Sequence, residues 1–376
     1  MIVPLDEYPV HQAPLSMAYT VNSDRNFYDR CYFNGHDRTG DIFLITGLGV
    51  YPNLGTIDAY ATIRRGDRHV TVRISDALSD DRMHQQVGPY RIEVIEPLTV
   101  IRVVCDADDP KFGQLGLGFD LTWRGSFPVV EEPPHIVRKG NTLMLDAQRF
   151  AQVGTWEGEI RIDGDTIAVS PDTWVGSRDR SWGIRPVGES TTPGRWEAER
   201  DPNFGFWWLY VPMRFDDYGI VVICQDQPDG TRVMNEAVRV WPSHTGRKEE
   251  QLGWPDVEIR YQSGTRLPTG ATIAMRKGRS EVVMEVESLN YVALNLGPGY
   301  GNDPAWNHGM WKGRNFIERV EHDLTDPRNQ AMVPFATIDH VARATVDGDI
   351  GFGLFEHSNV GRHDPSGFAD FTSVAL

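Results

Sequence analysis

The sequence predicts an all-β protein, because short strand-like segments recur throughout it, Asp-Gly turn signals separate several of them, and no long helical period appears. From His69 to Ile74 and from Tyr90 to Val94, polar and apolar residues alternate, as in strands with one face toward solvent. The turn signals are Asp163-Gly164, Asp229-Gly230 and Asp347-Gly348, and an Asp-Gly pair between apolar runs is a strong hairpin signal. Many short strands at regular spacing favour barrels or sandwiches.

The individual strands are expected where apolar or alternating runs are bounded by Gly, Asn, Asp or Pro. These segments are 41–46, 56–63, 69–74, 90–95, 99–104, 115–123, 157–162, 207–212, 219–224, 232–240, 256–261, 271–276, 281–287 and 340–346. Helical patterns are weak and short, near Asp76 and from Thr325 to Met332. The pattern argues against a doubly wound α/β fold. We expect no nucleotide cofactor, because the chain has neither a GxGxxG motif behind a strand nor a P-loop motif.

Composition restricts the class of partner. The 376 residues include 37 basic and 53 acidic side chains, for a net charge of −16, which disfavours nucleic acid and anionic membranes as partners. No apolar run approaches the roughly 18 residues of a membrane helix, and residues 1–7 lack the features of a signal peptide. Cys31, Cys105 and Cys224 are far apart and odd in number, so we expect buried, inert thiols and a cytoplasmic location.

The most unusual segment runs from Asp172 to Arg185 and combines charged residues with two tryptophans and two glycines. In an extended strand Arg178 and Arg180 would point away from the side of Asp179, because side chains alternate. Asp179 would then face a cavity alone, where desolvation raises the pKa of a carboxyl group and suits it to act as a general acid. The alternative is a structural Asp–Arg network that closes a domain interface.

Part of this segment also resembles a known family. Asp179-Arg180-Ser181-Trp182-Gly183 is similar to the signature of the carotenoid 1,2-hydratase (hydroxyneurosporene synthase) and AttH-like superfamily, although Arg180 stands where the family often has His. Residues 351–361 resemble the closing strand of that family, in which an aromatic residue precedes a Glu. Residues 33–38 and 47–53 resemble an actinobacterial-type branch whose function is mostly unassigned.

The resemblance implies two consecutive lipocalin-like antiparallel β-barrel domains. We place them at residues 1–190 and 191–376, because Pro and Gly cluster between residues 186 and 200. The hairpins around Asp163-Gly164 and Asp347-Gly348 are similar to each other and suggest a duplication.

The resemblance further implies an enzyme without a cofactor, which acts on a hydrophobic isoprenoid-, steroid- or polyketide-like substrate in an apolar cavity. The reaction would be acid-initiated hydration, cyclisation or isomerisation, with Asp179 as the acid and Glu356 guiding water or removing a proton. Glu356 lies between Phe355 and His357, and a partly exposed strand carboxylate is its alternative role.

Aromatic residues and one histidine are expected to bind the substrate, since aromatic faces stabilise cations; the alternative is that large aromatic side chains simply fill a barrel. The candidates are Trp174, Trp182, Trp208, Tyr210, Trp306, His308 and Trp311. The last three lie in a Gly-rich loop that would cover a barrel mouth. We expect no metal site, because the spacing of His357, His363 and Asp364 matches no strong ligand template.

Two other functions stay open at this point. One is a non-catalytic carrier of lipids or terpenoids, because barrels hold apolar ligands without chemistry. The other is a cyclase in which the shape of the cavity alone folds a reactive polyene, and in which no single carboxylate is essential.

Overall fold

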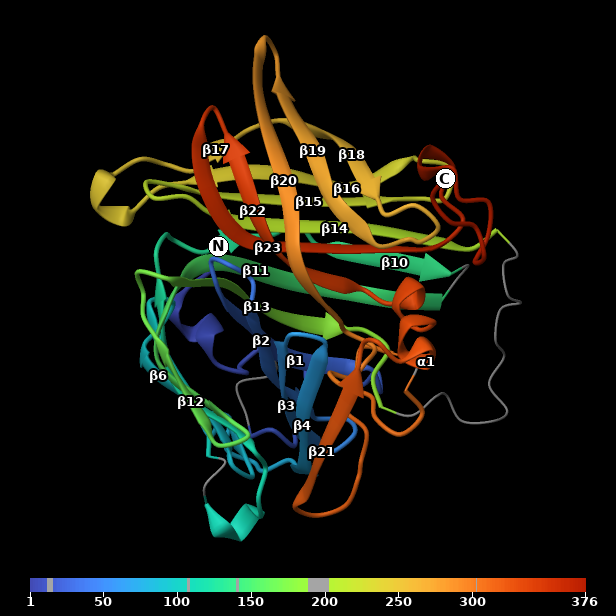
Figure 1. Ribbon diagram of the computed structural model, residues 1–376. Helices are drawn as coiled ribbons and strands as arrows, with labels where there is room; N and C mark the ends of the chain where they lie inside the picture. Colours follow the sequence, from blue (N-terminus) through green and yellow to red (C-terminus); the bar gives the residue numbers. More distant parts are fainter. Residues whose placement is uncertain (12–15, 107–108, 140–141, 189–202, 302) are drawn as a thin grey trace.

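The fold consists of two curled antiparallel β-sheets that pack against each other (Figure 1). The computed structural model describes residues 1–376 except 12–15, 107–108, 140–141, 189–202 and 302. The all-β, two-part lipocalin-like architecture predicted from the sequence is confirmed. Regular helix in the described residues is short, and the weakly helical segment 325–332 contains one turn, α1 (Pro327–Gln330).

The first sheet is built mainly from the N-terminal half. Its strands are β1 (Phe27–Asp37), β2 (Ile42–Tyr51), β3 (Thr56–Arg65), β4 (Arg68–Ala77), β5 (Gln86–Val87), β6 (Tyr90–Glu96), β7 (Val100–Cys105), β8 (Leu117–Gly125), β9 (Val130–Glu131), β10 (His135–Lys139), β11 (Thr142–Ile162), β12 (Asp165–Val169), β13 (Trp174–Ile184) and β21 (Phe316–Asp323). The main path through it runs β21-β4-β3-β2-β1-β13-β11-β8-β7-β6-β5.

The second sheet comes from the C-terminal half, in the order β17-β16-β15-β14-β23-β22-β20-β19-β18. Its strands are β14 (Gly205–Arg214), β15 (Gly219–Asp226), β16 (Arg232–Val240), β17 (Glu250–Gln251), β18 (Trp254–Tyr261), β19 (Pro268–Lys277), β20 (Ser280–Ala293), β22 (Ile338–Val346) and β23 (Asp349–Gly361). Short 3-10 turns occur at Pro4–Glu7, Pro110–Phe112, Ser243–Thr245, Val333–Phe335 and Asp364–Ser366.

Strand β21 links the two parts of the chain. It follows β20 in sequence, yet it pairs antiparallel with β4 at the edge of the first sheet, with Ile317 opposite Ile74. The predicted boundary between residues 190 and 191 lies outside the described residues. The division at that position stays a prediction, and β21 shows that the two halves are not separate along the sequence.

The three largest apolar clusters make up most of the core. One belongs to the first sheet and includes Trp123 and Trp156, and a second belongs to the second sheet and includes Phe355. The third lies between the sheets, because it joins Phe43 of β2 to Ile223 of β15. Each sheet therefore buries residues on both of its faces. The two faces that meet between the sheets could also form a binding site.

The Asp-Gly hairpins have the geometry that their sequence predicts. Asp347 and Gly348 have φ of 51° and 94°, and Asp163 and Gly164 have φ of 50° and 92°. Positive φ at both central residues defines the type I′ turn that joins twisted strands tightly. The turn fixes the register of the strands that it joins, so that Val346 pairs with Asp349 and Asp339 pairs with Glu356.

Candidate functional site

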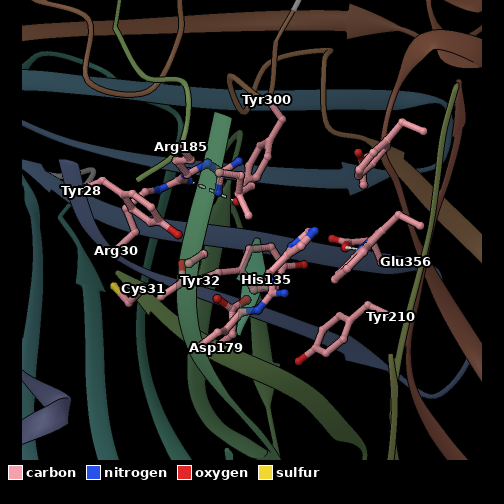
Figure 2. Close-up of a pocket in the computed structure, with 17 residues that line it drawn as sticks. Tyr28, Arg30, Cys31, Tyr32, His135, Asp179, Arg185, Tyr210, Tyr300 and Glu356 are labelled. Carbon is pink, nitrogen blue, oxygen red and sulfur yellow. Dashed lines mark hydrogen bonds between the residues drawn. The ribbon is translucent and has the colours of Figure 1, made fainter. Parts of the chain in front are cut away.

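A cavity lies between the two sheets, not inside either curled sheet (Figure 2). Its walls come from β1, β10, β11 and β13 of the first sheet and from β14 and β23 of the second. Its volume is about 140 Å³, close to the roughly 150 Å³ of an engineered cavity that binds benzene. The space is therefore sized for one ring or for the reactive end of a longer molecule.

The first-sheet wall is a two-strand ladder in which alternate side chains face the cavity. Tyr32 pairs with Asp179 and Arg30 with Ser181 across β1 and β13, and all four residues line the cavity. Tyr28, one position further along the same face of β1, also lines it. Because side chains alternate along a strand, these residues form one continuous surface, with Asp179 toward one end and Arg30 toward the other.

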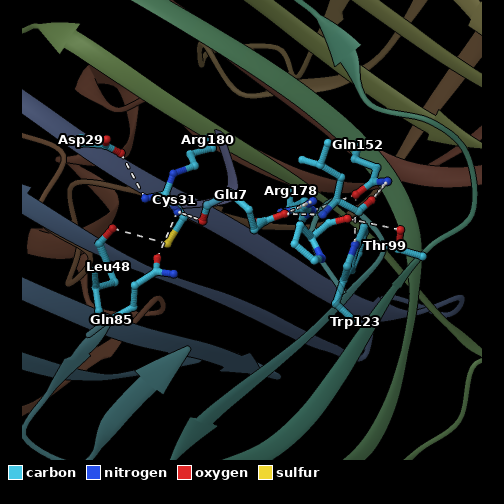
Figure 3. Close-up of polar contacts among 12 residues, drawn as sticks. Glu7, Asp29, Cys31, Leu48, Gln85, Thr99, Trp123, Gln152, Arg178 and Arg180 are labelled. Atoms are coloured by element: carbon cyan, nitrogen blue, oxygen red, sulfur yellow. Dashed lines mark hydrogen bonds and ion pairs between the residues drawn. The ribbon is translucent and has the colours of Figure 1, made fainter. Parts of the chain in front are cut away.

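The opposite face of the same ladder carries a buried ion-pair network (Figure 3). Arg178 donates to both carboxylate oxygens of Glu7, at 2.6 and 2.9 Å, and to Gln152 at 2.8 Å. Arg180 pairs with Asp29 at 3.2 Å and donates to the carbonyl oxygen of Glu7 at 2.9 Å. The two arginines that flank Asp179 in sequence thus point away from it, as strand alternation predicts.

Asp179 titrates in an unusual environment for a carboxyl group. Its pKa is raised to about 6, mainly by burial and also by the nearby Glu356, while Arg149, Arg30 and Arg185 oppose the shift. The raised pKa lets Asp179 keep its proton at a higher pH than an ordinary aspartate, which favours a role as a general acid. The carboxyl group lies in the lower centre of the view in Figure 2.

Glu356 comes from β23 of the second sheet and lines the same cavity. It accepts a hydrogen bond from the indole Nε1 of Trp208, which lies on the neighbouring strand β14 and also lines the cavity. On its other side it pairs in register with Asp339 of β22. The sequence alone did not show whether Asp179 and Glu356 meet, and the structure brings both to one cavity.

Asp339 is a buried carboxyl group that the sequence analysis did not single out. It is fully buried and accepts a hydrogen bond from the Tyr32 hydroxyl at 2.5 Å. Burial and the adjacent Glu356 raise the pKa of Asp339 well above its usual range, which favours the protonated form of Asp339. A signal was present, since counting outward from the Asp347-Gly348 turn places Asp339 opposite Glu356.

Trp208 and Tyr210 line the cavity, as predicted. The Trp208 ring stacks on His135 with centroids 5.2 Å apart, and the Arg149 guanidinium lies 5.1 Å from the ring centre. Arg149 also pairs with the buried Glu132. The aromatic surface expected to stabilise a substrate cation therefore already has a protein cation on it. The Tyr210 hydroxyl is buried and has no hydrogen-bond partner among the described residues.

The Gly-rich loop contributes Tyr300 directly to the cavity, while His308 lies one layer behind it. Arg30 donates to the Tyr300 hydroxyl at 3.2 Å and lies 3.1 Å from Nε2 of His308. Burial and Arg30 lower the pKa of His308 well below its usual range, so its neutral ring accepts from the guanidinium. We therefore assign His308 the position of a support for Arg30.

The remaining predicted binding residues lie away from the cavity. Trp174 belongs to the apolar cluster of the first sheet. Trp182 shares the face of Arg180 and stacks on His11 at 3.5 Å between centroids. Trp306 is fully buried against Phe316, and Trp311 is 49% exposed. Their spacing in sequence gave no information on which face of the fold each would occupy.

The cavity is also more polar than the sequence analysis expected. Besides Asp179 and Glu356, its described walls include Arg30, Arg149 and Arg185. Apolar contacts come from side chains such as Leu145 and Phe206. The cavity that we expected to be apolar therefore has walls of mixed polar and apolar character. The reason is that charged residues of β1, β11 and β13 lie on the face between the sheets. The sequence pattern does not distinguish such a face from one that is exposed to solvent.

Other features bear on cofactors and location. The three cysteines are buried and free, and burial raises the pKa of the Cys31 thiol to about 11. Among the described residues no cluster of His, Cys, Asp and Glu has an arrangement suited to a metal ion. No helix in the described part of the chain has the length and apolar character to cross a membrane.

The fold and the site define a protein of two packed lipocalin-like half-barrels with a carboxyl-lined cavity between them. The model of a family of unknown function, DUF8625, matches residues 2–369, and the chain belongs to that family. No curated protein matches the chain.

Solved structures share the fold at low identity. An AttH-type protein from Nitrosomonas europaea is 12% identical with a TM-score of 0.53, over 88% of this chain and 92% of that one. Kievitone hydratase from Nectria haematococca is 12% identical with a TM-score of 0.51, over 95% of this chain and 93% of that one. The two-part lipocalin-like fold expected from the sequence is thereby supported, and likeness at this identity shows the fold alone.

The Glu7–Arg178 pair yields a prediction on stability. Glu7→Gln leaves the Arg178 charge buried without a counter-ion, so we expect the free energy of unfolding to fall by about 3 kcal/mol. Glu131→Gln is the matched control, because its pair with the N-terminus is exposed at 93% and 55% and should change stability by less than about 1 kcal/mol. Urea denaturation of both variants measures the difference, and equal effects would contradict a structural role for Glu7.

The raised pKa of Asp179 yields a second prediction, on stability against pH. Burial raises this pKa from 3.8 to about 6, so the folded state binds the proton more tightly than the unfolded state and stability falls as pH rises through that window. Asp179→Asn should therefore be more stable than the natural protein at about pH 8, by roughly 1–3 kcal/mol, with the gain vanishing below about pH 4.

The control for this experiment is Asp172→Asn, which alters an exposed carboxylate of the same segment. Its stability should follow the natural protein at every pH. An Asp179→Asn variant that gains no stability at alkaline pH would show that Asp179 is ionised without cost in the folded state.

Proposed function

We propose that this protein catalyses the addition of water to a carbon–carbon double bond of a small molecule, without a cofactor, by general acid–base catalysis in the inter-sheet cavity. The observation that carries the proposal is the convergence of Asp179 from the first sheet and Glu356 from the second on one buried space. Two carboxyl groups whose environments differ provide an acid and a base at the same pH.

Asp179 is the proposed acid. Its protonated form delivers a proton to one alkene carbon, and the side chain becomes a carboxylate that Arg149, Arg30 and Arg185 stabilise. The general-acid contribution of such a group is typically about 10²–10⁴-fold in rate. The alternative role for Asp179 was membership of a structural Asp–Arg network. Such a network does exist, but it involves Arg178 and Arg180 on the other face of the strand.

Glu356 is the proposed base. The Trp208 indole donates a hydrogen bond to one of its oxygens, and Asp339 lies beside it in register on β22. Glu356 accepts a proton from water while the water oxygen bonds to the second alkene carbon. One water is consumed, its hydrogen and hydroxyl are added across the double bond, and proton exchange with solvent restores both carboxyl groups.

The size and polarity of the cavity restrict the substrate further. A volume of about 140 Å³ admits one ring or one chain end, which disfavours storage of a whole carotenoid-sized molecule. The similarity of fold to a protein named kievitone hydratase is in line with hydration. Cyclisation or isomerisation would use the same acid and would leave no added water in the product, and a carrier would leave its ligand unchanged.

The test is incubation of the protein with small-molecule extracts of its host in water enriched in ¹⁸O, followed by mass spectrometry. We expect a product heavier than its precursor by one labelled water. Asp179→Asn should lower its rate of formation by roughly 10²-fold or more, and Glu356→Gln should do the same. Asp172→Asn is the control and should be unaffected.

The alternatives give distinct results in the same experiment. A product isomeric with its precursor indicates cyclisation or isomerisation. Recovery of a bound but unchanged ligand indicates a carrier. An undiminished rate in Asp179→Asn removes Asp179 as the acid.

A further inference from the structure

One end of the cavity concentrates positive charge. Arg30 and Arg185 both line this end together with Tyr28 and Tyr300, and Figure 2 shows the four residues gathered away from Asp179 and Glu356. Arg30 lies 5.1 Å and Arg185 lies 5.7 Å from the centre of the Tyr300 ring, and Arg185 lies 5.6 Å from the Tyr28 ring. The two cations are thus held by aromatic faces.

Arg30 lacks the partner that a buried guanidinium normally has. It is 4% exposed, and its Nη1 has no hydrogen-bond partner among the described residues. Its Nη2 donates hydrogen bonds to the Tyr300 hydroxyl and to Nε2 of His308. Within the described part of the chain, no carboxylate forms an ion pair with Arg30 or Arg185. Buried charges are ordinarily paired and hydrogen-bonded, so the unpartnered Nη1 of Arg30 can donate a direct hydrogen bond to an anion in the cavity.

Asp58 acts on Arg30 through its charge, but among the described residues it forms neither a hydrogen bond nor an ion pair with Arg30. It lies behind His308, 3.8 Å from Nδ1, and accepts hydrogen bonds from the Tyr51 hydroxyl at 3.1 Å and from the Gly309 amide at 2.6 Å. Burial raises the pKa of Asp58 to about 6. Its role is to hold the loop that carries His308, which in turn holds Arg30.

We propose that Arg30 and Arg185 form a subsite for an ionised oxygen of the substrate, so that the reacting double bond is conjugated to a carboxylate or to a carbonyl that becomes an enolate. This inference rests on the proposed function and names the substrate class for it. The ladder sets the spacing. Tyr32 pairs with Asp179, and Arg30 lies two residues further along β1. At roughly 3.3 Å per residue, Arg30 is therefore displaced by about 7 Å along the strand from the position of Asp179.

The same charges decide the order of the chemical steps. A carbocation formed by initial protonation would meet three cationic side chains, which is unfavourable in a space of low dielectric. Addition of water first sends negative charge to the conjugated oxygen, where preorganised donors stabilise it. Glu356 removes the water proton, the oxygen–carbon bond forms at the β-carbon, and the π electrons move to the carbonyl oxygen. The enolate then takes the Asp179 proton at the α-carbon.

The test compares benzoate with benzamide, which have similar shapes and differ in charge, by isothermal titration calorimetry. We expect the natural protein to bind benzoate at least tenfold more tightly. Arg185→Gln and Arg30→Met should each abolish most of that preference, because each removes a charge-assisted hydrogen bond. Arg328→Gln alters an arginine whose side chain is 90% exposed, and it should retain the preference.

The outcomes separate this inference from the proposed function. Equal affinity for the two ligands, or no binding of either at millimolar concentration, would overturn the anion subsite. If Arg30→Met does not fold, the partly exposed Arg185 still decides the result. Asp179→Asn should keep the benzoate preference, so a preserved preference with undiminished turnover would defeat the acid role of Asp179 and leave the subsite standing. Competition between benzoate and 4-nitrophenolate distinguishes a carboxylate from an enolate-like oxygen.

Discussion

The antiparallel pairing of β1 with β13 is the constraint on which the site depends. Both strands lie in the middle of the first sheet, and each buries both of its faces. One face anchors the N-terminal turn through Glu7, Arg178 and Arg180. The other face aligns Tyr32, Asp179 and Arg30 along the cavity. A slip of one residue would exchange the two faces, so the buried ion pairs also hold Asp179 in its place.

The second sheet completes the site from the opposite side. The hairpin of β22 and β23 places Asp339 beside Glu356, and Trp208 of β14 fixes the latter. The proposed acid Asp179 and the proposed base Glu356 come from different sheets. Packing of the two half-barrels therefore assembles the proposed site, and the apolar cluster that joins β2 to β15 helps to hold the two carboxyl groups on one cavity.

The fold was largely predictable from the sequence, because alternation and Asp-Gly turns are local signals. The direction of Asp179 was predictable for the same reason. Asp339 was within reach, since the type I′ turn at Asp347-Gly348 determines the strand register by counting. Contacts between residues far apart in sequence could not be predicted in this way. Examples are Tyr300, which reaches the cavity from a loop, and Trp182, which stacks on His11. The crossing of β21 to β4 also has no local signal, because it depends on packing between halves.

The central claim is that Asp179 is a carboxyl group with a raised pKa that faces the inter-sheet cavity and can deliver its proton there. The most direct measurement is the infrared carbonyl stretch of that carboxyl group, obtained from the difference between the natural protein and Asp179→Asn and followed against pH. The account predicts that the protonated band disappears with a midpoint near 6. A midpoint at or below the ordinary value of about 4 for an aspartate would contradict it.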